Sequence, residues 1–397
     1  MIKIAILGLG TVGTGVVKVV EANTAPIRHR LGEPLGVKTA LVRTLRRGPY
    51  CHLMTDRFRD IETDSEIRVV VETIGGTGAA YEYTRRCLMA GKHVVTANKQ
   101  LVAEHGCELL ELARKNHVNY LFEASVGGGI PILHPLTQCM AANRVDEIYG
   151  ILNGTTNFIL TKMVREKMPF EEALKLAQEK GYAEADPTAD VEGIDAGRKI
   201  CILADLAFGH QVNPEKVPME GITGLDLKDV ELAGHHGYRI KLLGRCLRLE
   251  GNRRTAYVAP HLISADNPIS DVNDVFNAVV VRGNATGEVM FYGKGAGELP
   301  TASAVVADVM ECVLESRPRP EIGWSADEGG FVSPLELKGC WYFRSHAPAE
   351  RVQALVPEAR ILEAGEDTVF ITPPVTGQEA EALAKRLPVS AHLRVLG

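Results

Sequence analysis

The first 130 residues alternate short apolar runs with stretches whose apolar residues recur every three or four positions. Helical periodicity begins at about Thr11, again around residues 80–91, and again at Leu101. The apolar runs between these stretches are typical of buried strands and read IKIAIL, VKTALV, IRVVVETI, HVVTA and VNYLFEA. Strands that alternate with helices predict an α/β domain with a parallel sheet and crossover helices over residues 1–130.

The alternation stops near Pro131. Helical patterns follow at residues 158–164 and 170–178, and a later strand pattern reads GEVMFYG. This mixed order predicts a second, α+β domain over residues 131–325, with a last helix that returns to the first domain. Residues 330–397 read as strand, helix, strand, strand, helix, strand, which predicts a small βαββαβ module at the C-terminus.

The segment GLGTVG, residues 8–13, is a G-x-G-x-x-G that follows a strand and opens a helix. In that position glycines let the backbone approach a pyrophosphate at a helix N-terminus, so a Rossmann-type dinucleotide site is predicted. The second strand ends LVRTLRRG, with Arg43, Arg46 and Arg47 where an NAD site usually carries an acidic residue. This favours NADP, with NAD possible, although a solvated loop would equally explain Arg46 and Arg47.

The charge of the chain limits the classes of partner that it can bind. The chain has 44 Lys and Arg against 50 Asp and Glu, a net charge of −6, and no basic run that would form a footprint for nucleic acid or an anionic membrane. A small-molecule partner is therefore expected. The N-terminus MIKIAILGLG enters a strand directly and no apolar run is long enough to span a bilayer, so we expect a cytoplasmic protein. The eight cysteines show no C-x-x-C or zinc-type spacing.

The segment GYAEADPTADVEGIDAGRK, residues 181–199, gathers five carboxylates beside one lysine. Pro187 bars a helix through the first acids, so the sequence predicts a helix start near residues 190–192 with Asp190 as N-cap. Asp195 and Lys199 are then one turn apart on one face. The apolar continuation ICILADLAFG directs Lys199 into the protein, where a buried lysine paired with a carboxylate can transfer protons.

Two further segments could carry chemistry. HVVTANKQL places Lys99 at the carboxyl end of a parallel strand, where open α/β sheets bind ligands, although its position would equally suit a surface lysine at the start of the next helix. The glycines of FEASVGGGIP, residues 122–131, could free carbonyls for a hard cation or form an interdomain hinge, and the residues alone favour the hinge. Acids such as Glu184 would suit the ammonium of a zwitterionic substrate, but part of this cluster could simply cap and solubilise a helix.

These motifs, together with GILNGTTNFIL and GKGAGELPTASAVVAD, resemble homoserine dehydrogenase over about residues 1–325. The resemblance implies an NAD(P)-dependent oxidoreductase that interconverts L-homoserine and L-aspartate 4-semialdehyde. That reaction lies on the route to threonine, isoleucine and methionine. It also implies a homo-oligomer, a homodimer in its simplest form.

Matched position by position, the resemblance implies that Lys199 is the proton donor and acceptor, with Lys99 beside it, and that Glu184 and Asp195 bind the amino acid. It assigns the cofactor to Gly10, Thr11, Val12, Arg43, Lys99, Gly181 and Gly297. It also implies a monovalent cation such as sodium at Glu123, Val126, Gly128 and Ile130, which replaces the hinge as the interpretation of that loop.

The C-terminal module resembles an ACT domain, the amino-acid-sensing fold. Its first loop reads SHAPAERV in place of the D-x-P-G type of turn through which such domains usually hold a ligand. We therefore expect a packing or dimerisation element in preference to a threonine sensor. The competing hypothesis for the whole chain is a non-catalytic, NADP-binding amino-acid sensor. Lys99 and Lys199 argue against it, since sensing gives no reason to keep a base there.

Overall fold

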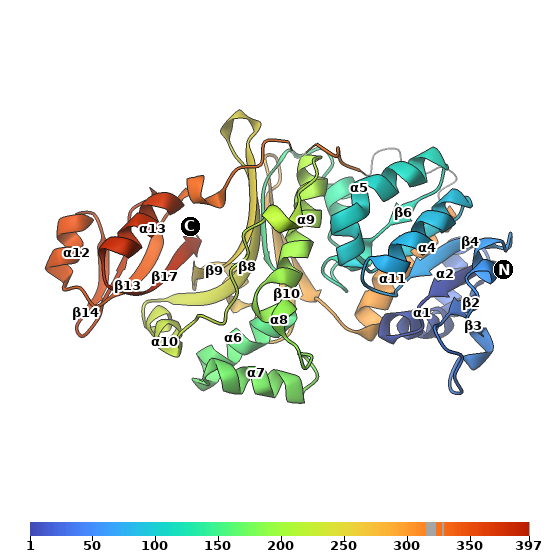
Figure 1. The fold of residues 1–397 in the computed structure, drawn as a ribbon, viewed down its shortest axis with the longest axis horizontal. Coiled ribbons are helices and arrows are strands. Elements are labelled where there is room, and N and C mark those ends of the chain that lie inside the picture. Colours follow the sequence, from blue (N-terminus) through green and yellow to red (C-terminus); the bar gives the residue numbers. More distant parts are fainter. Residues whose placement is uncertain (315–322, 328, 397) are drawn as a thin grey trace.

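The structure is a computed structural model that describes residues 1–314, 323–327 and 329–396. Residues 315–322, near the end of the predicted second domain, lie outside these described residues. Residue 397, the last of the predicted module, does so as well. Figure 1 shows an elongated molecule with the N-terminal domain at one end, the central domain in the middle and the C-terminal module at the other end. Within the described residues, no helix is both long and apolar enough to cross a bilayer.

The N-terminal domain is built on a parallel sheet with strand order β3-β2-β1-β4-β5-β6, which confirms the predicted parallel α/β domain. The strand order reverses between β1 and β4, the switch point at which open α/β sheets bind ligands. Its elements are β1 (Ile2–Leu7), α1 (Thr11–Ala22), α2 (Thr24–Leu31), β2 (Leu35–Leu41), β3 (Met54–Thr55), α3 (Arg59–Glu62), β4 (Ile67–Glu72), α4 (Gly78–Met89), β5 (His93–Thr96), α5 (Lys99–Lys115) and β6 (Tyr120–Leu121).

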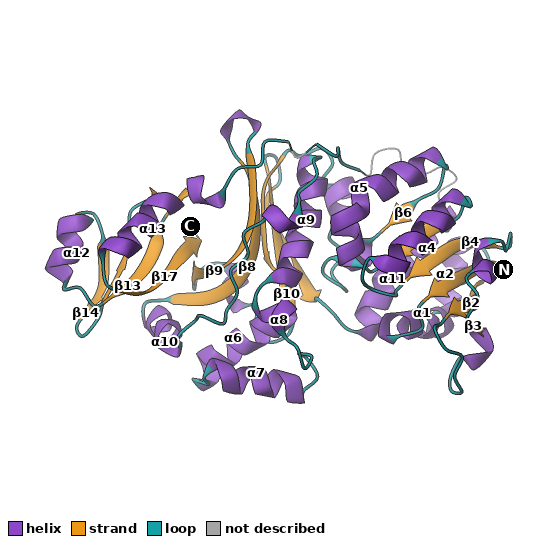
Figure 2. Cartoon of the chain, viewed as in Figure 1, coloured by secondary structure: helices purple, strands orange, loops and turns teal. Residues whose placement is uncertain are grey.

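The apolar runs of β1, β4 and β5 are buried on both faces, which explains why they show little polar alternation, whereas β2 nearer the edge of the sheet is only partly buried. Ile4 and Ile6 belong to a core cluster on the side of α1, whereas Ala5 and Leu7 belong to the cluster that includes residues of α4 and α5. Figure 2 shows the helices on both sides of this sheet.

The central domain carries a mixed sheet whose strands continue into the C-terminal module, in the order β11-β10-β7-β8-β9-β17-β13-β15-β14. The helix α9 packs against β8, β9 and α5, and α11 returns to pack on α1. Its elements are β7 (Val145–Ile151), α6 (Gly154–Glu166), α7 (Phe170–Glu179), α8 (Thr188–Val191), α9 (Ile194–Phe208), α10 (Leu227–His235), β8 (Tyr238–Arg248), β9 (Arg254–Ser264), β10 (Phe276–Gly283), β11 (Gly287–Lys294) and α11 (Glu298–Leu314).

The C-terminal module follows the strand and helix order that the sequence predicted, with two short extra strands. Its final strand pairs in parallel with β9 through Arg394 and His261, so the module extends the central sheet instead of standing apart. The elements are β12 (Lys338–Gly339), β13 (Trp341–Ser345), α12 (Ala349–Leu355), β14 (Arg360–Ala364), β15 (Thr368–Ile371), β16 (Val375–Thr376), α13 (Gly377–Arg386) and β17 (Val389–Leu396).

The predicted start of the helix that carries Lys199 was wrong. The short helix α8 ends at Val191, and Gly193 adopts a left-handed φ of +80° before α9 begins at Ile194. A side chain at Gly193 would place a Cβ 3.0 Å from Val258, so this break is built for glycine. Asp190 therefore does not cap α9. The one-turn spacing of Asp195 and Lys199 is kept.

Candidate active site in the cleft between the first two domains

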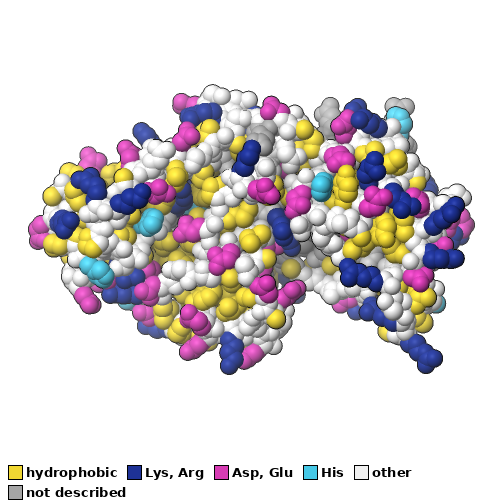
Figure 3. Space-filling model, in the orientation of Figure 1, with side chains coloured by type: hydrophobic (Ala, Val, Ile, Leu, Met, Phe, Trp, Pro, Cys, Tyr) yellow, Lys and Arg dark blue, Asp and Glu magenta, His cyan; other side chains and the backbone are white. Residues whose placement is uncertain are grey.

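A cleft of about 700 Å³ lies where the N-terminal domain meets the central domain. Its walls come from the start of α5, the start of α6, the loop before α8, the first turns of α9 and the loop after β11. The predicted site residues that line it are Lys99, Gly181, Glu184, Asp195, Lys199 and Gly297. The structure thus brings together residues almost 200 positions apart in the sequence. On the face drawn in Figure 3, acidic and basic side chains are interspersed.

The Asp195 carboxylate joins the two lysines of the cleft. Its Oδ1 lies 2.7 Å from Nζ of Lys99, and its Oδ2 lies 2.7 Å from Nζ of Lys199. Lys99 is the first residue of α5 in the N-terminal domain, whereas Asp195 and Lys199 lie on α9 in the central domain. This ion pair therefore spans the two domains, and the predicted pairing of Asp195 with Lys199 is present.

Lys199 is 9% exposed and holds a second contact, from Nζ to the carbonyl oxygen of Leu152 at 2.7 Å. Burial lowers the pKa of Lys199, and the Asp195 carboxylate opposes that shift only in part. Burial would raise the pKa of Asp195, but the ammonium groups of Lys199 and Lys99 outweigh it and hold that pKa below its usual range. An ammonium has three N–H donors, so two fixed contacts leave Lys199 one donor for a ligand.

The acids of residues 181–199 divide into two kinds. Asp186 accepts hydrogen bonds from the backbone and hydroxyl of Thr188, and Glu192 accepts one from the hydroxyl of Thr223 at 3.0 Å, so both have structural partners. Glu184 is exposed on the cleft wall. Asp190 also lines the cleft, and burial raises the pKa of its carboxyl against a hydrogen bond from Asn153.

Asn153 is a cleft residue to which the sequence reasoning assigned no role. Its side-chain amide donates to Asp190 and to Asp195, and its oxygen caps α6. The signal was available, because an Asn between an apolar strand and a helix is a strong N-cap candidate. The pattern could not reveal which carboxylates the amide would meet.

The glycine-rich turn has the geometry that a pyrophosphate requires. Gly8 has a φ of +99°, and a Cβ at Gly13 would lie 2.0 Å from the Gly8 carbonyl oxygen, so neither position admits a side chain. A Cβ at Gly10 would meet no described atom within 4 Å. No described side chain caps α1 at Gly10, so the first N–H groups of the helix, including those of Thr11 and Val12, suit an anionic ligand.

The arginines after β2 are not equivalent. Arg46 donates from Nη2 to the carbonyl oxygen of Leu9 at 2.9 Å, which places its guanidinium on the glycine-rich turn. Arg43 and Arg47 are exposed in the same segment. Arg46, which the sequence left equally open to a solvated loop, therefore lies against the turn.

Two consecutive residues at the end of β4 support both halves of this region. Thr73 donates from Oγ1 to the Gly8 carbonyl at 2.7 Å and so holds the glycine-rich turn. Glu72, fully buried, accepts from the Thr96 hydroxyl at 2.6 Å. Oγ1 of Thr96 in turn accepts from the backbone of Asn98 at 2.9 Å, and Asn98 caps the helix that begins with Lys99.

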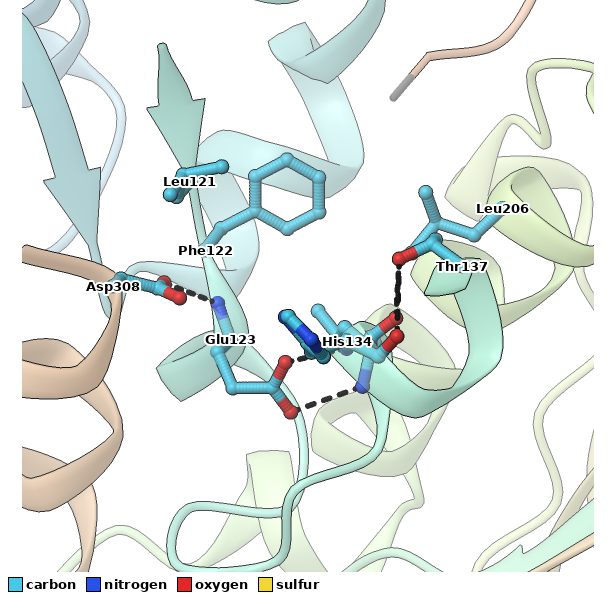
Figure 4. A pocket seen from close by; sticks show the side chains of 8 residues that line it. Leu121, Phe122, Glu123, His134, Thr137, Leu206 and Asp308 are labelled. Atoms are coloured by element: carbon cyan, nitrogen blue, oxygen red, sulfur yellow. Dashed lines mark hydrogen bonds between the residues drawn. The ribbon is translucent and has the colours of Figure 1, made fainter. Parts of the chain in front are cut away.

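The loop predicted to hold a cation contacts the wall of this cleft, since the N–H of Gly129 donates to the carbonyl oxygen of Lys294, and Figure 4 shows Glu123, the first of the predicted ligands. The Glu123 carboxylate accepts backbone hydrogen bonds from Ile132, Leu133 and His134 at 2.6 to 2.9 Å, and its own N–H donates to Asp308 of α11 at 2.9 Å. The other predicted ligands, Val126, Gly128 and Ile130, are buried. The described residues hold no cluster of three His, Cys, Asp or Glu side chains suited to a metal, so a cation here would depend on carbonyl oxygens.

Family models match most of the chain. Residues 8–123 match the model described as homoserine dehydrogenase, NAD binding domain, and residues 131–310 match the model described as homoserine dehydrogenase. A homoserine dehydrogenase of Bacillus subtilis is 45% identical over 320 residues, which cover 80% of this chain and 74% of the relative. One of Synechocystis is 44% identical over 341 residues, covering 84% and 77%.

Solved structures agree. A homoserine dehydrogenase from Thiobacillus denitrificans superposes with a TM-score of 0.91 at 36% identity and covers 100% of this chain and 98% of its own. A hyperthermophilic archaeal homoserine dehydrogenase in complex with NADPH has a TM-score of 0.67 at 27% identity, covering 79% of this chain and 98% of its own.

Proposed function

The chain belongs to the homoserine dehydrogenase family of NAD(P)-dependent oxidoreductases, and from that premise we propose how its own residues divide the reaction. The reaction exchanges L-homoserine and L-aspartate 4-semialdehyde, so its substrates are small molecules. The nicotinamide, when bound, supplies the hydride acceptor or donor. The protein has to bind the amino acid, hold its terminal oxygen, and move one proton.

Lys199 moves the proton. In the oxidising direction its neutral amine takes the proton of the substrate hydroxyl, and in the reducing direction its ammonium returns it. The observation that carries this role is a buried lysine with two contacts fixed, to Asp195 and Leu152, and one donor left. Burial lowers the pKa of Lys199 and so increases the share of neutral amine near physiological pH.

Lys99 and Asp195 set the geometry around that amine. The Asp195 carboxylate fixes the amine of Lys199 and ties it to Lys99 across the domain boundary. Lys99 is more exposed than Lys199 and lines the cleft, so it contacts both substrate and cofactor. An ion pair between two domains also makes the reaction depend on their relative placement.

Glu184 and Asp190 receive the substrate ammonium. Both carboxyl groups line the cleft, and Asp190 accepts a hydrogen bond there from Asn153, whereas Asp186 and Glu192 accept from Thr188 and Thr223 outside this pair. A carboxylate beside a primary ammonium supplies the charge-assisted hydrogen bond that selects an amino acid over a simple alcohol.

NADP is the proposed cofactor, held by Gly10, Thr11 and Val12 at the start of α1, with Gly181 and Gly297 lining the cleft. Arg43, supported by Arg46 on the turn, receives the adenosine phosphate. The archaeal relative that carries NADPH supports this preference.

We also propose a monovalent cation such as sodium at the carbonyls of Glu123, Val126, Gly128 and Ile130. The loop contacts the segment after β11 that lines the cleft, since the N–H of Gly129 donates to the carbonyl oxygen of Lys294 at 3.0 Å. Sodium should therefore raise the unfolding temperature at matched ionic strength more than a bulky organic cation does, and equal effects would refute the site.

The C-terminal module is proposed as an ACT-like packing element within a homodimer. Its strand order β17-β13-β15-β14 and its βαββαβ sequence support the likeness. A monomer mass by light scattering at working concentration would refute the dimer.

The cofactor proposal is tested by initial rates of L-homoserine oxidation with NADP and with NAD. Wild type should give the higher kcat/KM with NADP. Replacing Arg43 by Glu should lower that value about tenfold or more and leave the NAD rate nearly unchanged, because only NADP carries the extra phosphate. Exposed Arg57→Glu serves as the charge-matched control. Equal losses with both cofactors would remove Arg43 from this role.

A further inference from the structure

Asn153 connects the two carboxylates nearest to the reacting lysine. Its Nδ2 lies 2.7 Å from Oδ1 of Asp190 and 2.9 Å from Oδ2 of Asp195. A side-chain amide has two N–H donors, and both are used on these carboxylates. The residue is 6% exposed, so water competes little for these bonds.

The remaining atoms of this segment anchor it. Oδ1 of Asn153 accepts the backbone N–H of Thr156 at 2.8 Å and its hydroxyl at 3.1 Å, which makes Asn153 the N-cap of α6. The preceding residue, Leu152, accepts from Lys199 through its carbonyl at 2.7 Å. Two consecutive residues therefore contact Lys199, Asp195 and Asp190.

We infer that Asn153 is a positioning residue for the proton-transfer pair formed by Asp195 and Lys199. Its amide separates Asp190 from Asp195 and holds Oδ2 of Asp195 on the amine of Lys199. The inference rests on the function proposed above. Two neighbouring carboxylates with no donor between them tend to share a proton, and a protonated Asp190 would compete for Asp195 and lose the substrate ammonium.

Other charged side chains also line the cleft around Asp190 and Asp195, and they contribute to the pH dependence of kcat/KM. They come from α5, the loop before α8, α9 and the end of β11, and they are Lys99, Glu184, Asp186, Arg198, Lys199 and Lys294. The Asn153 amide differs from all of them because it is neutral and contacts both carboxylates at once. Its hydrogen bond lowers the pKa of Asp190 against the raising effect of burial.

Substitutions at position 153 separate two functions of Asn153, the capping of α6 and the hydrogen bonds to Asp190 and Asp195. Asn153→Ser keeps a good N-cap but cannot reach both carboxylates, whereas Asn153→Ala loses both functions. We expect the serine variant to unfold close to the wild-type temperature and to bind NADPH normally. Its KM for homoserine should rise about tenfold or more, the loss expected for one hydrogen bond to a charged group. The acid limb of its kcat/KM profile should move to higher pH, because Asp190 takes up a proton more readily.

A double variant tests whether protonation of Asp190 causes the shift of the acid limb. In an Asp190→Asn background, Asn153→Ser should no longer shift the acid limb, because the carboxylate that gains the proton is gone. An acid limb that does not shift, or a KM for homoserine that stays at the wild-type value, in the single serine variant would overturn the inference. If wild type itself shows no homoserine-dependent turnover, or if Lys199→Ala retains it, the proposed function fails instead, so the two failures are distinguishable.

Discussion

Asp195 shows how much a single side chain decides in this cleft. Each of its oxygens holds a different lysine at 2.7 Å, so one carboxylate sets two ammonium groups from two domains. A simple i, i+4 pair on a surface helix would contribute only about 0.3–0.5 kcal/mol. Here the pair is buried, and its value lies in the protonation state and position that it gives Lys199.

The pH dependence of both reaction directions follows from Lys199. Burial lowers its pKa from the ordinary 10.5, so oxidation of homoserine, which needs the neutral amine, should rise with pH along a limb below that value. Reduction of the semialdehyde needs the ammonium and should fall over the same range.

The pH profile of Asp195→Asn should be compared with that of wild type, since the ionisation of the substrate is the same in both measurements. The lost carboxylate had raised the pKa of Lys199, so the limb should move to lower pH in pH profiles of kcat. A limb that stays in place would mean that another group titrates.

The sequence predicted the pairing of Asp195 with Lys199 because helical spacing is a local property. It misplaced Asp190, because α8 ends at Val191 and the chain turns through Gly193, at a left-handed φ of +80°, before α9 begins. It gave no role to Asn153, whose partners are 37 and 42 residues away. Contacts of that separation come from tertiary packing and leave no periodic pattern.

Among the elements, the strand–turn–helix unit around GLGTVG was predicted most fully. Its requirement for glycine is steric, as the 2.0 Å approach of a Cβ at Gly13 to the Gly8 carbonyl shows. What the sequence could not supply is the support from β4, where Thr73 holds that turn and Glu72 holds the segment before Lys99.

A matched pair of glycine substitutions tests this unit. Gly13→Ala forces a backbone shift and should cost about 1–3 kcal/mol of stability, with weaker NADPH binding. Gly78→Ala, at the start of α4, meets no described atom within 4 Å and should be neutral. NADPH fluorescence titration and thermal unfolding measure both effects. Equal NADPH affinity in the two variants would contradict the geometry of the turn.

Across the whole molecule, the C-terminal module is held to the central domain by charge as well as by strand pairing. Arg344 of β13 is 6% exposed and contacts both oxygens of Asp229 on α10 at 2.8 Å. The sequence predicted the order of elements in this module, but the parallel pairing of β17 with β9 joins strands more than 100 residues apart and could not be read locally.

Arg344→Met should leave the buried Asp229 uncompensated and lower the free energy of unfolding by about 3–5 kcal/mol. Adding Asp229→Leu should restore much of that loss, because the unpaired charge is removed. Arg351→Met, at an exposed arginine of α12, is the control. Calorimetry that found Arg344→Met as stable as wild type would show that the ion pair contributes nothing to docking.

The central claim is that Lys199 transfers the proton in a cleft that binds cofactor independently of it. The most direct measurement compares wild type with Lys199→Ala for homoserine-dependent NADPH formation, alongside NADPH affinity by fluorescence. General acid–base catalysis contributes about 10²–10⁴-fold, so turnover should fall by at least that range while NADPH affinity stays close to wild type. The exposed Lys175→Ala should change neither quantity. Turnover that survives in Lys199→Ala, or a matching loss of NADPH binding, would contradict the assignment.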